Sequence, residues 1–190
     1  RADAAHKSEM VSQLLFGELF EIIQVQNEWL RIKTDYDQYN GWVLATQVQM
    51  LELMAFKSIK KQPLFLCNDL IGVLDGGMPF PVVLGSTLPN YDYKKCSVLD
   101  QHYHFHGEAI STPHKTISIA NFVEHAMLYL NAPYLWGGRS PLGIDCSGFT
   151  QMVFKLAGIK LKRDAYLQAE EGNQILLLNE TQPADLAFFE

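Results

Sequence analysis

The first half of the chain alternates apolar and polar residues over short distances, which is typical of β-strands. Residues 20–50 contain several such runs, and Asn27-Glu28 is predicted to be the turn between two of them. Asn40-Gly41 is predicted to form a type I′ hairpin turn, because both residues tolerate a positive φ angle. Residues 62–107 continue in the same style. Short strands with close turns predict two small β-barrels, at residues 1–50 and 51–112.

A helical pattern begins beyond these strands. From Ile119 the apolar residues recur with the spacing of one helical face, and Asn131 and Pro133 are predicted to end this helix. His125 lies on the polar side of the apolar stripe. We therefore expect His125 to be solvated.

A glycine-rich loop at residues 136–143 leads into a second predicted helix, and Gly158 is placed as the residue after its C-cap. Residues 183–189 are predicted to begin a buried strand. Because this apolar strand closes the sequence at Glu190, where its ladder partners are missing, we expect the natural polypeptide to continue beyond it.

Composition and charge exclude several classes of protein. The chain has 190 residues, of which 48% are hydrophobic and 19% are charged, so disorder and coiled coils are excluded. Its longest purely aliphatic run, residues 175–178, is far shorter than the roughly 18 residues that span a bilayer. The net charge of −6, with no run of three basic residues, argues against a nucleic-acid partner. A start at Arg1 rather than Met predicts that a leader was removed.

The chain has three cysteines, and their pairing is open: Cys67 and Cys96 could form a disulfide, or all three could be thiols. Cys146 falls at the start of the second predicted helix, where the macrodipole and unpaired backbone N–H groups favour a thiolate. Asp145 is its predicted N-cap, but the charge of Asp145 opposes the thiolate, so activation by an imidazolium is required. Helical spacing turns Cys146 toward a cleft or the core. The alternative is a buried, inert thiol.

Several segments resemble the NlpC-type cysteine peptidases, which are papain-like enzymes that cut bacterial cell-wall peptides. The N-terminal part is similar to a subgroup with bacterial SH3-like domains, the γ-D-glutamyl-L-diamino-acid endopeptidases of the dipeptidyl-peptidase VI type. The segments that carry the resemblance are Pro133-Tyr134-Leu135-Trp136-Gly137-Gly138, Asp145-Cys146-Ser147-Gly148-Phe149, Arg163-Asp164-Ala165, Pro183-Ala184-Asp185-Leu186 and residues 6–13 and 39–43. Ala184 departs from the usual glycine, and Ala165 from the hydroxyl residue that the subgroup often has.

The resemblance implies two SH3-like β-barrels followed by an α+β papain-like peptidase domain at residues 113–190, incomplete at its C-terminus in this sequence. It implies that Cys146 is the nucleophile and that the Tyr134 hydroxyl helps the Cys146 backbone N–H to bind the oxyanion. The residues implied to bind the substrate are Trp136, Asp145, Ser147, Glu9, Tyr39 and Asp164. The last three are expected to hold the free amino group of the L-Ala of the substrate, because an ammonium in a closed site needs opposite charge.

The family takes its general base from a histidine on a strand after the Pro-Gly-Asp-Leu segment, but no histidine follows the predicted nucleophile in this sequence. His102, His104 and His106 alternate with Tyr103 and Phe105, so the three imidazoles of a strand here share one face. A Zn²⁺ site is one interpretation. We expect instead a half-exposed strand with the aromatic residues turned inward, and no metal or organic cofactor.

The sequence therefore predicts a cysteine peptidase that hydrolyses the γ-D-glutamyl-L-diamino acid bond of murein peptides with a free N-terminal L-Ala. The alternative is a catalytically inactive cell-wall-binding protein that uses its SH3-like domains. The predicted substrate and the removed leader favour the bacterial cell envelope, and a cytoplasmic location is the alternative.

Overall fold

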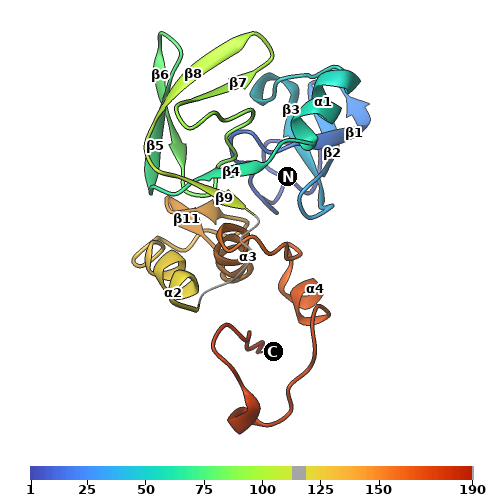
Figure 1. Ribbon diagram of the computed structural model, residues 1–190. Coiled ribbons are helices and arrows are strands. Elements are labelled where there is room, and N and C mark those ends of the chain that lie inside the picture. Colours follow the sequence, from blue (N-terminus) through green and yellow to red (C-terminus); the bar gives the residue numbers. More distant parts are fainter. Residues whose placement is uncertain (113–118, 190) are drawn as a thin grey trace.

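The structure is a computed structural model that describes residues 1–112 and 119–189 (Figure 1). The N-terminal region holds a three-stranded antiparallel sheet in the order β1-β2-β3. Its strands are β1 (Phe20–Gln26), β2 (Trp29–Thr34) and β3 (Asn40–Leu44). Asn27 takes a φ of 51° between β1 and β2, which confirms the turn predicted there.

The hairpin turn predicted at Asn40-Gly41 is wrong, because both residues lie inside β3. The chain reverses in the preceding residues, where Gln38 has a φ of 62°. One oxygen of the Asp37 carboxylate accepts hydrogen bonds from the hydroxyl of Thr34 and from the backbone N–H of Tyr39, the latter at 3.2 Å. An aspartate that binds its own turn in this way offers the backbone an alternative to the two-residue turn.

A second group of strands follows the 3₁₀ turn η1 (Ala45–Gln47) and helix α1 (Leu53–Lys60), which the strand pattern did not predict. A four-stranded antiparallel sheet has the order β6-β5-β8-β7, and β4 pairs separately with β9. The bounds are β4 (Leu64–Cys67), β5 (Ile71–Asp75), β6 (Pro79–Val83), β7 (Lys95–Val98), β8 (Gln101–His106) and β9 (Ala109–Thr112). The predicted strands are present, but within residues 1–112 no sheet closes into a barrel.

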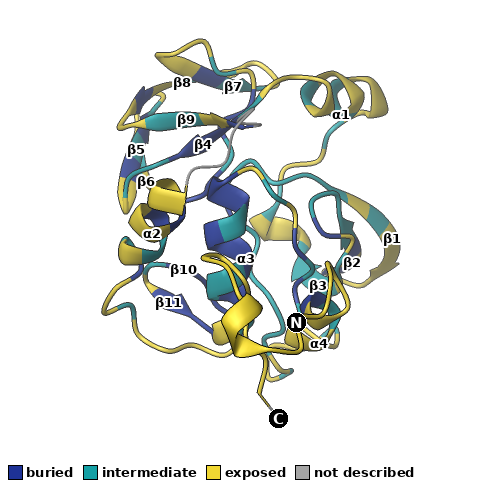
Figure 2. Ribbon diagram, turned by 60° about the horizontal axis from the view of Figure 1, so that its bottom comes forward, coloured by how far each residue is buried: buried dark blue, intermediate teal, exposed yellow. Residues whose placement is uncertain are grey.

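The C-terminal region is built around helix α3, which is buried at the centre of the molecule (Figure 2). Met152 and Leu156 of α3 are fully buried, and they pack in one core with Leu15, Leu66 and Leu84 from the preceding regions. The elements here are α2 (Ile119–Met127), β10 (Arg139–Ser140), β11 (Gly143–Ile144), α3 (Cys146–Leu156), α4 (Ala165–Ala169) and η2 (Leu178–Glu180). No helix in the described part of the chain is both long and apolar enough to cross a bilayer.

Helix α2 forms where the apolar spacing predicts it, but only part of the predicted apolar stripe is buried. Phe122 and His125 are 7% and 8% exposed, whereas Val123 and Met127 are each 57% exposed. The prediction of a solvated His125 is therefore wrong. The ring of Phe122 packs edge-on against that of Phe154 on α3, with 4.9 Å between centroids.

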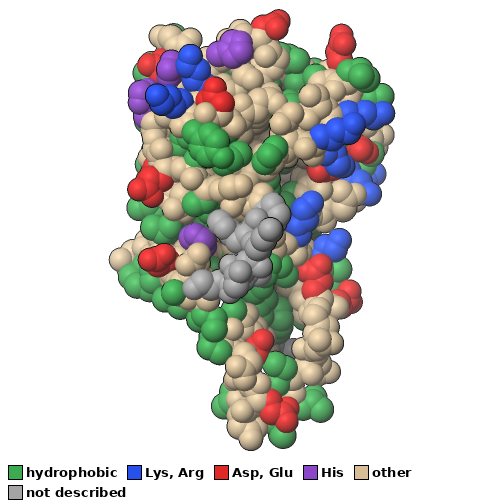
Figure 3. Space-filling model, viewed as in Figure 1, with side chains coloured by type: hydrophobic (Ala, Val, Ile, Leu, Met, Phe, Trp, Pro, Cys, Tyr) green, Lys and Arg blue, Asp and Glu red, His purple; other side chains and the backbone are tan. Residues whose placement is uncertain are grey.

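Residues 183–189 do not form the predicted strand, and most of them are exposed. They belong to a tail that begins after α4 and extends away from the body of the molecule (Figure 1). Hydrophobic side chains remain on the surface of this tail (Figure 3), with Leu178 at 89% and Phe189 at 92% exposure. No strand among the described residues lies beside this segment to supply ladder hydrogen bonds.

Candidate active site

Cys146 is the first residue of α3, and its side chain is exposed rather than turned into a cleft or the core. Asp145 is the N-cap, as predicted: its Oδ1 accepts from the backbone N–H of Gly148 at 2.6 Å. Its Oδ2 accepts from the N–H of Gly137 at 2.8 Å. One carboxylate therefore joins the glycine-rich loop to the first turn of the helix that carries the thiol.

The glycine-rich loop needs glycine because the backbone of other segments lies directly against it. Gly137 has a φ of 75°, and a Cβ there would lie 2.4 Å from the carbonyl oxygen of Met10. A Cβ on Gly148 would lie 2.2 Å from the carbonyl oxygen of Gly138. These close approaches bring the N-terminal segment, the loop and the start of α3 together.

Asp145 also forms a buried ion pair with Arg163, and the two residues are 7% and 2% exposed. The Nη2 and Nη1 groups of Arg163 donate to Oδ2 and Oδ1 of Asp145 at 2.6 and 3.1 Å. Burial alone raises the pKa of Asp145, but the hydrogen bonds from Arg163 and from the backbone of Gly148 outweigh it and lower that pKa. The carboxylate thus faces the protein interior, and a substrate could meet this residue only through its backbone.

The residues predicted to bind the amino group lie around the same loop. Glu9 is exposed and accepts a hydrogen bond from the indole Nε1–H of Trp136 at 2.6 Å. Tyr39 and Asp164 are partly buried and hydrogen-bond to each other. Burial raises the pKa of Asp164, and burial together with the Asp164 charge raises that of Tyr39 to about 12. The carboxylates come from segments more than 150 positions apart.

Tyr134, Trp136 and Ser147 are the remaining predicted site residues, and all three lie near the surface. Tyr134 and Trp136 are 68% and 60% exposed, so neither is a core aromatic residue. Ser147 follows Cys146 in α3 and accepts a hydrogen bond from Arg163 Nη1 at 2.9 Å. The positions of these side chains permit contact with a substrate.

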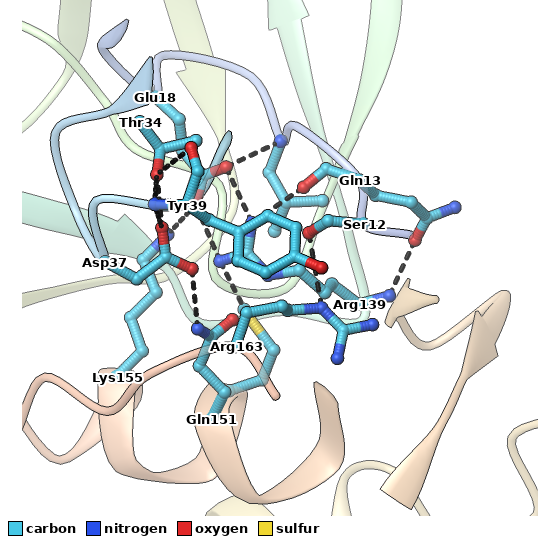
Figure 4. Close-up of polar contacts among 12 residues, drawn as sticks. Ser12, Gln13, Glu18, Thr34, Asp37, Tyr39, Arg139, Gln151, Lys155 and Arg163 are labelled. Carbon is cyan, nitrogen blue, oxygen red and sulfur yellow. Dashed lines mark hydrogen bonds and ion pairs between the residues drawn. The ribbon is translucent and has the colours of Figure 1, made fainter. Parts of the chain in front are cut away.

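A buried ionic cluster below the loop was not predicted from the sequence (Figure 4). Glu18, whose side chain is 4% exposed, accepts hydrogen bonds from Arg139 at 2.9 and 3.0 Å and from Lys155 at 2.6 Å. Asp37 interacts electrostatically with both cations and accepts from Gln151 at 2.8 Å. Burial alone raises the pKa of Glu18, but Arg139 and Lys155 lower it to about 2. The cluster has two positive and two negative groups, so its charge is balanced.

Strand β8 has the predicted half-exposed pattern, with its aromatic residues turned inward. His102, His104 and His106 are exposed, whereas Tyr103 is half-buried and Phe105 is buried. Figure 3 shows histidine and basic side chains together on the surface at this end of the sheet. Among residues 1–112 and 119–189, no three His, Cys, Asp or Glu side chains are arranged to hold a metal ion.

All three cysteines are free thiols, so Cys67 and Cys96 are not joined. We expect iodoacetamide to modify Cys146 at least tenfold faster than the other two at pH 8, because only the exposed thiolate reacts. Burial raises the pKa of the Cys67 thiol and raises that of Cys96 to about 11. Peptide mapping after brief labelling measures the three rates. Equal labelling rates for the three cysteines in the native protein would contradict the structure. Labelling in urea is the control, because all three thiols should react fast there.

The comparisons with known proteins agree with this architecture. Residues 131–190 match the NlpC/P60 family, and residues 1–48 match the bacterial dipeptidyl-peptidase SH3 domain. A gamma-D-glutamyl-L-lysine dipeptidyl-peptidase from Bacillus subtilis is 29% identical over 189 residues, which cover 94% of this chain and 63% of that protein. Dipeptidyl-peptidase 6 from Lysinibacillus sphaericus is 26% identical over 216 residues, covering 96% of this chain and 74% of that protein.

A solved structure shares the fold. The crystal structure of an NlpC/P60 family protein from Bacillus cereus superposes with a TM-score of 0.79 at 20% identity, covering 91% of this chain and 63% of that one. The chain therefore spans 63% of the length both of this structure and of the Bacillus subtilis relative. The resemblance predicted from the motifs is confirmed: residues 1–48 match a bacterial dipeptidyl-peptidase SH3 domain and residues 131–190 match the NlpC/P60 family.

Proposed function

We propose that the protein is a cysteine peptidase that hydrolyses the γ-D-glutamyl-L-diamino acid bond of short murein peptides. The observation that carries the proposal is Cys146, an exposed thiol on the first residue of a capped helix within the segment that matches the NlpC/P60 family. The names of two relatives that match nearly the whole of this chain, a gamma-D-glutamyl-L-lysine dipeptidyl-peptidase and a dipeptidyl-peptidase 6, support the substrate class.

In the proposed reaction the Cys146 thiolate attacks the γ-carbonyl carbon of D-Glu. The Cys146 backbone N–H and the Tyr134 hydroxyl donate to the oxyanion, since donors placed where charge develops lower the barrier. Collapse of the tetrahedral intermediate breaks the amide bond as its nitrogen takes up a proton, which releases the diamino acid as an amine. The thioester that remains is hydrolysed by water to the γ-carboxylate of D-Glu and the free Cys146 thiol. The histidine that the family uses to protonate the leaving amine has no counterpart after Cys146 in this sequence.

The proposed recognition of a free N-terminal L-Ala rests on two carboxylates near the loop. Glu9 is oriented by the indole N–H of Trp136, and Asp164 by the hydroxyl of Tyr39. An ammonium group placed between them would face two negative charges, which compensate for the hydration that it loses on leaving water. A blocked amine is neutral, so it would bring no positive charge to the two carboxylates.

We further propose the finer architecture that the motifs imply. Residues 1–50 and 51–112 would each correspond to an SH3-like barrel, and residues 113–190 to a papain-like α+β domain. The separate sheets before and after α1 support a division of the first 112 residues. A cell-wall substrate also favours a location in the bacterial envelope.

The test compares L-Ala-γ-D-Glu-L-Lys with its N-acetylated form on the natural full-length protein. Loss of one hydrogen-bonded charge contact typically costs about 2–5 kcal/mol, so acetylation is expected to lower kcat/KM by roughly 30- to 4,000-fold. Glu9→Gln should reduce this discrimination, whereas Glu28→Gln, at an exposed turn, should not. Similar kcat/KM values for the two peptides would refute the proposed recognition of the free N-terminal amine. The absence of any hydrolysis would favour an inactive wall-binding protein.

A further inference from the structure

Arg163 is the most completely enclosed cation next to Cys146 among the described residues, and the proposed reaction gives it no role. Its guanidinium donates twice to Asp145 and once to Ser147 Oγ, and its Nε donates to Ser12 Oγ at 3.2 Å. Its side chain is 1% exposed, so it cannot bind the substrate directly. It contacts the residues on both sides of Cys146 in the chain.

The electrostatic problem that Arg163 addresses follows from the position of Asp145. A carboxylate at an N-cap stabilises the helix, but its negative charge lies next to the residue that must become a thiolate. Nearby like charges disfavour the ionised form of a group. A buried, bidentate guanidinium cancels this charge while it leaves both carboxylate oxygens free to accept the Gly137 and Gly148 N–H groups.

We infer that Arg163 is a positioning residue for the nucleophile: it neutralises Asp145 and fixes the first turn of α3, so that the N-cap does not suppress the Cys146 thiolate. The inference rests on the proposed role of Cys146. Arg163 is thus a source of positive charge within the described residues, in addition to the imidazolium expected from the sequence.

Gln168 provides a second link between the segment that carries Arg163 and the first turn of α3. Gln168, which is 2% exposed, donates through Nε2 to the carbonyl of Ser147 at 2.9 Å and to that of Lys162 at 2.8 Å. Its Oε1 accepts from the hydroxyl of Thr150 at 2.6 Å. Gln168 thus ties the backbone beside Arg163 to the turn that carries the thiol. Asp164 and Tyr39 also interact electrostatically with the ion pair, and Asp37 interacts with Asp164.

Two variants test the role of the Arg163 charge: Arg163→Met and the double variant Arg163→Met with Asp145→Asn. The rate at which iodoacetamide modifies Cys146 is measured from about pH 5 to pH 9 on the 190-residue chain. Arg163→Met leaves the Asp145 charge uncancelled, so the rate at neutral pH should fall about tenfold and the profile should move to higher pH. The double variant removes both charges and keeps an N-cap oxygen, so it should return the rate to within about threefold of the wild type.

A purely structural role would give a different result, because the double variant loses every Arg163 hydrogen bond and would not recover. Lys162→Met is the matched control: it removes a positive charge one residue away and should leave the profile unchanged. Cys67 and Cys96 report unfolding, since both are buried in the native protein. Unchanged alkylation in Arg163→Met, or a double variant that stays slow or exposes Cys67, would overturn the inference. Because no substrate is used, its failure is distinct from a failure of the proposed peptidase activity.

Discussion

Replacement of Cys146 by alanine is expected to lower kcat/KM for the murein peptide by at least about 10⁴-fold in the natural full-length protein. Removal of a nucleophile leaves only the rate that binding and oxyanion donors provide. The stability of the protein should change by less than about 0.5 kcal/mol, because the Cys146 side chain is exposed and fills no core position. Hydrolysis is followed by release of free diamino acid, and stability by urea unfolding.

Cys96→Ala is the matched control, because it changes the same residue type in the opposite environment. Cys96 is 1% exposed on β7, so its truncation leaves space in the core and should cost about 1 kcal/mol or more. Its kcat/KM should stay close to the wild-type value. Retained hydrolysis in Cys146→Ala would show that another group performs the attack and would refute the proposed mechanism.

Glu18→Gln is expected to destabilise the protein by about 3–5 kcal/mol, which corresponds to a fall in Tm of roughly 6–20 °C. The substitution keeps the shape of the side chain but removes the negative charge between Arg139 and Lys155, each of which is 2% exposed. Two cations would then remain buried with only Asp37 to oppose them. The exposed Glu28→Gln variant should shift stability by less than about 0.5 kcal/mol. An equally small effect at Glu18 would show that the cluster contributes little.

The Glu18 effect should also depend on pH in one direction. Folding lowers the pKa of this carboxyl from its ordinary 4.5 to about 2. Its contribution, about 3 kcal/mol, is therefore present in full above pH 4.5 and is lost as the pH falls toward 2. The stability difference between the wild type and Glu18→Gln, measured by urea unfolding, should shrink over that window. A difference that stays constant from pH 6 to pH 2.5 would contradict the assigned ionisation.

The sequence predicted the local features of the site, because each depends on neighbouring residues. Asp145 as N-cap, Gly158 in the left-handed conformation after α3 and the turn at Asn27 all follow from residue preferences within a few positions. The glycine-rich loop that precedes Cys146 was visible in the sequence, but the reason for Gly137 was not, because the Met10 carbonyl that lies against it comes from a distant segment.

The features that were missed or wrong depend on distant partners. Glu18 and Arg139 are 121 positions apart, and Arg163 contacts Ser12 across 151 positions. A short-range pattern in the sequence therefore cannot predict either pair. Helix α2 buries Phe122 of the predicted stripe together with His125, and the ring of Phe154 on α3 that Phe122 contacts comes from a distant element. Residues 183–189 have the composition of a strand, but an apolar run forms a strand only where another strand accepts its hydrogen bonds.

The origin of the charges in the buried cluster has a consequence for chimeric proteins. Glu18 and Asp37 come from the N-terminal region, whereas Arg139 and Lys155 come from the C-terminal one. Neither region is neutral at this contact on its own, so a module taken from a relative with uncharged residues there would leave two like charges buried. A domain exchange should therefore transfer the four residues as a set, or replace all four with apolar side chains of similar volume.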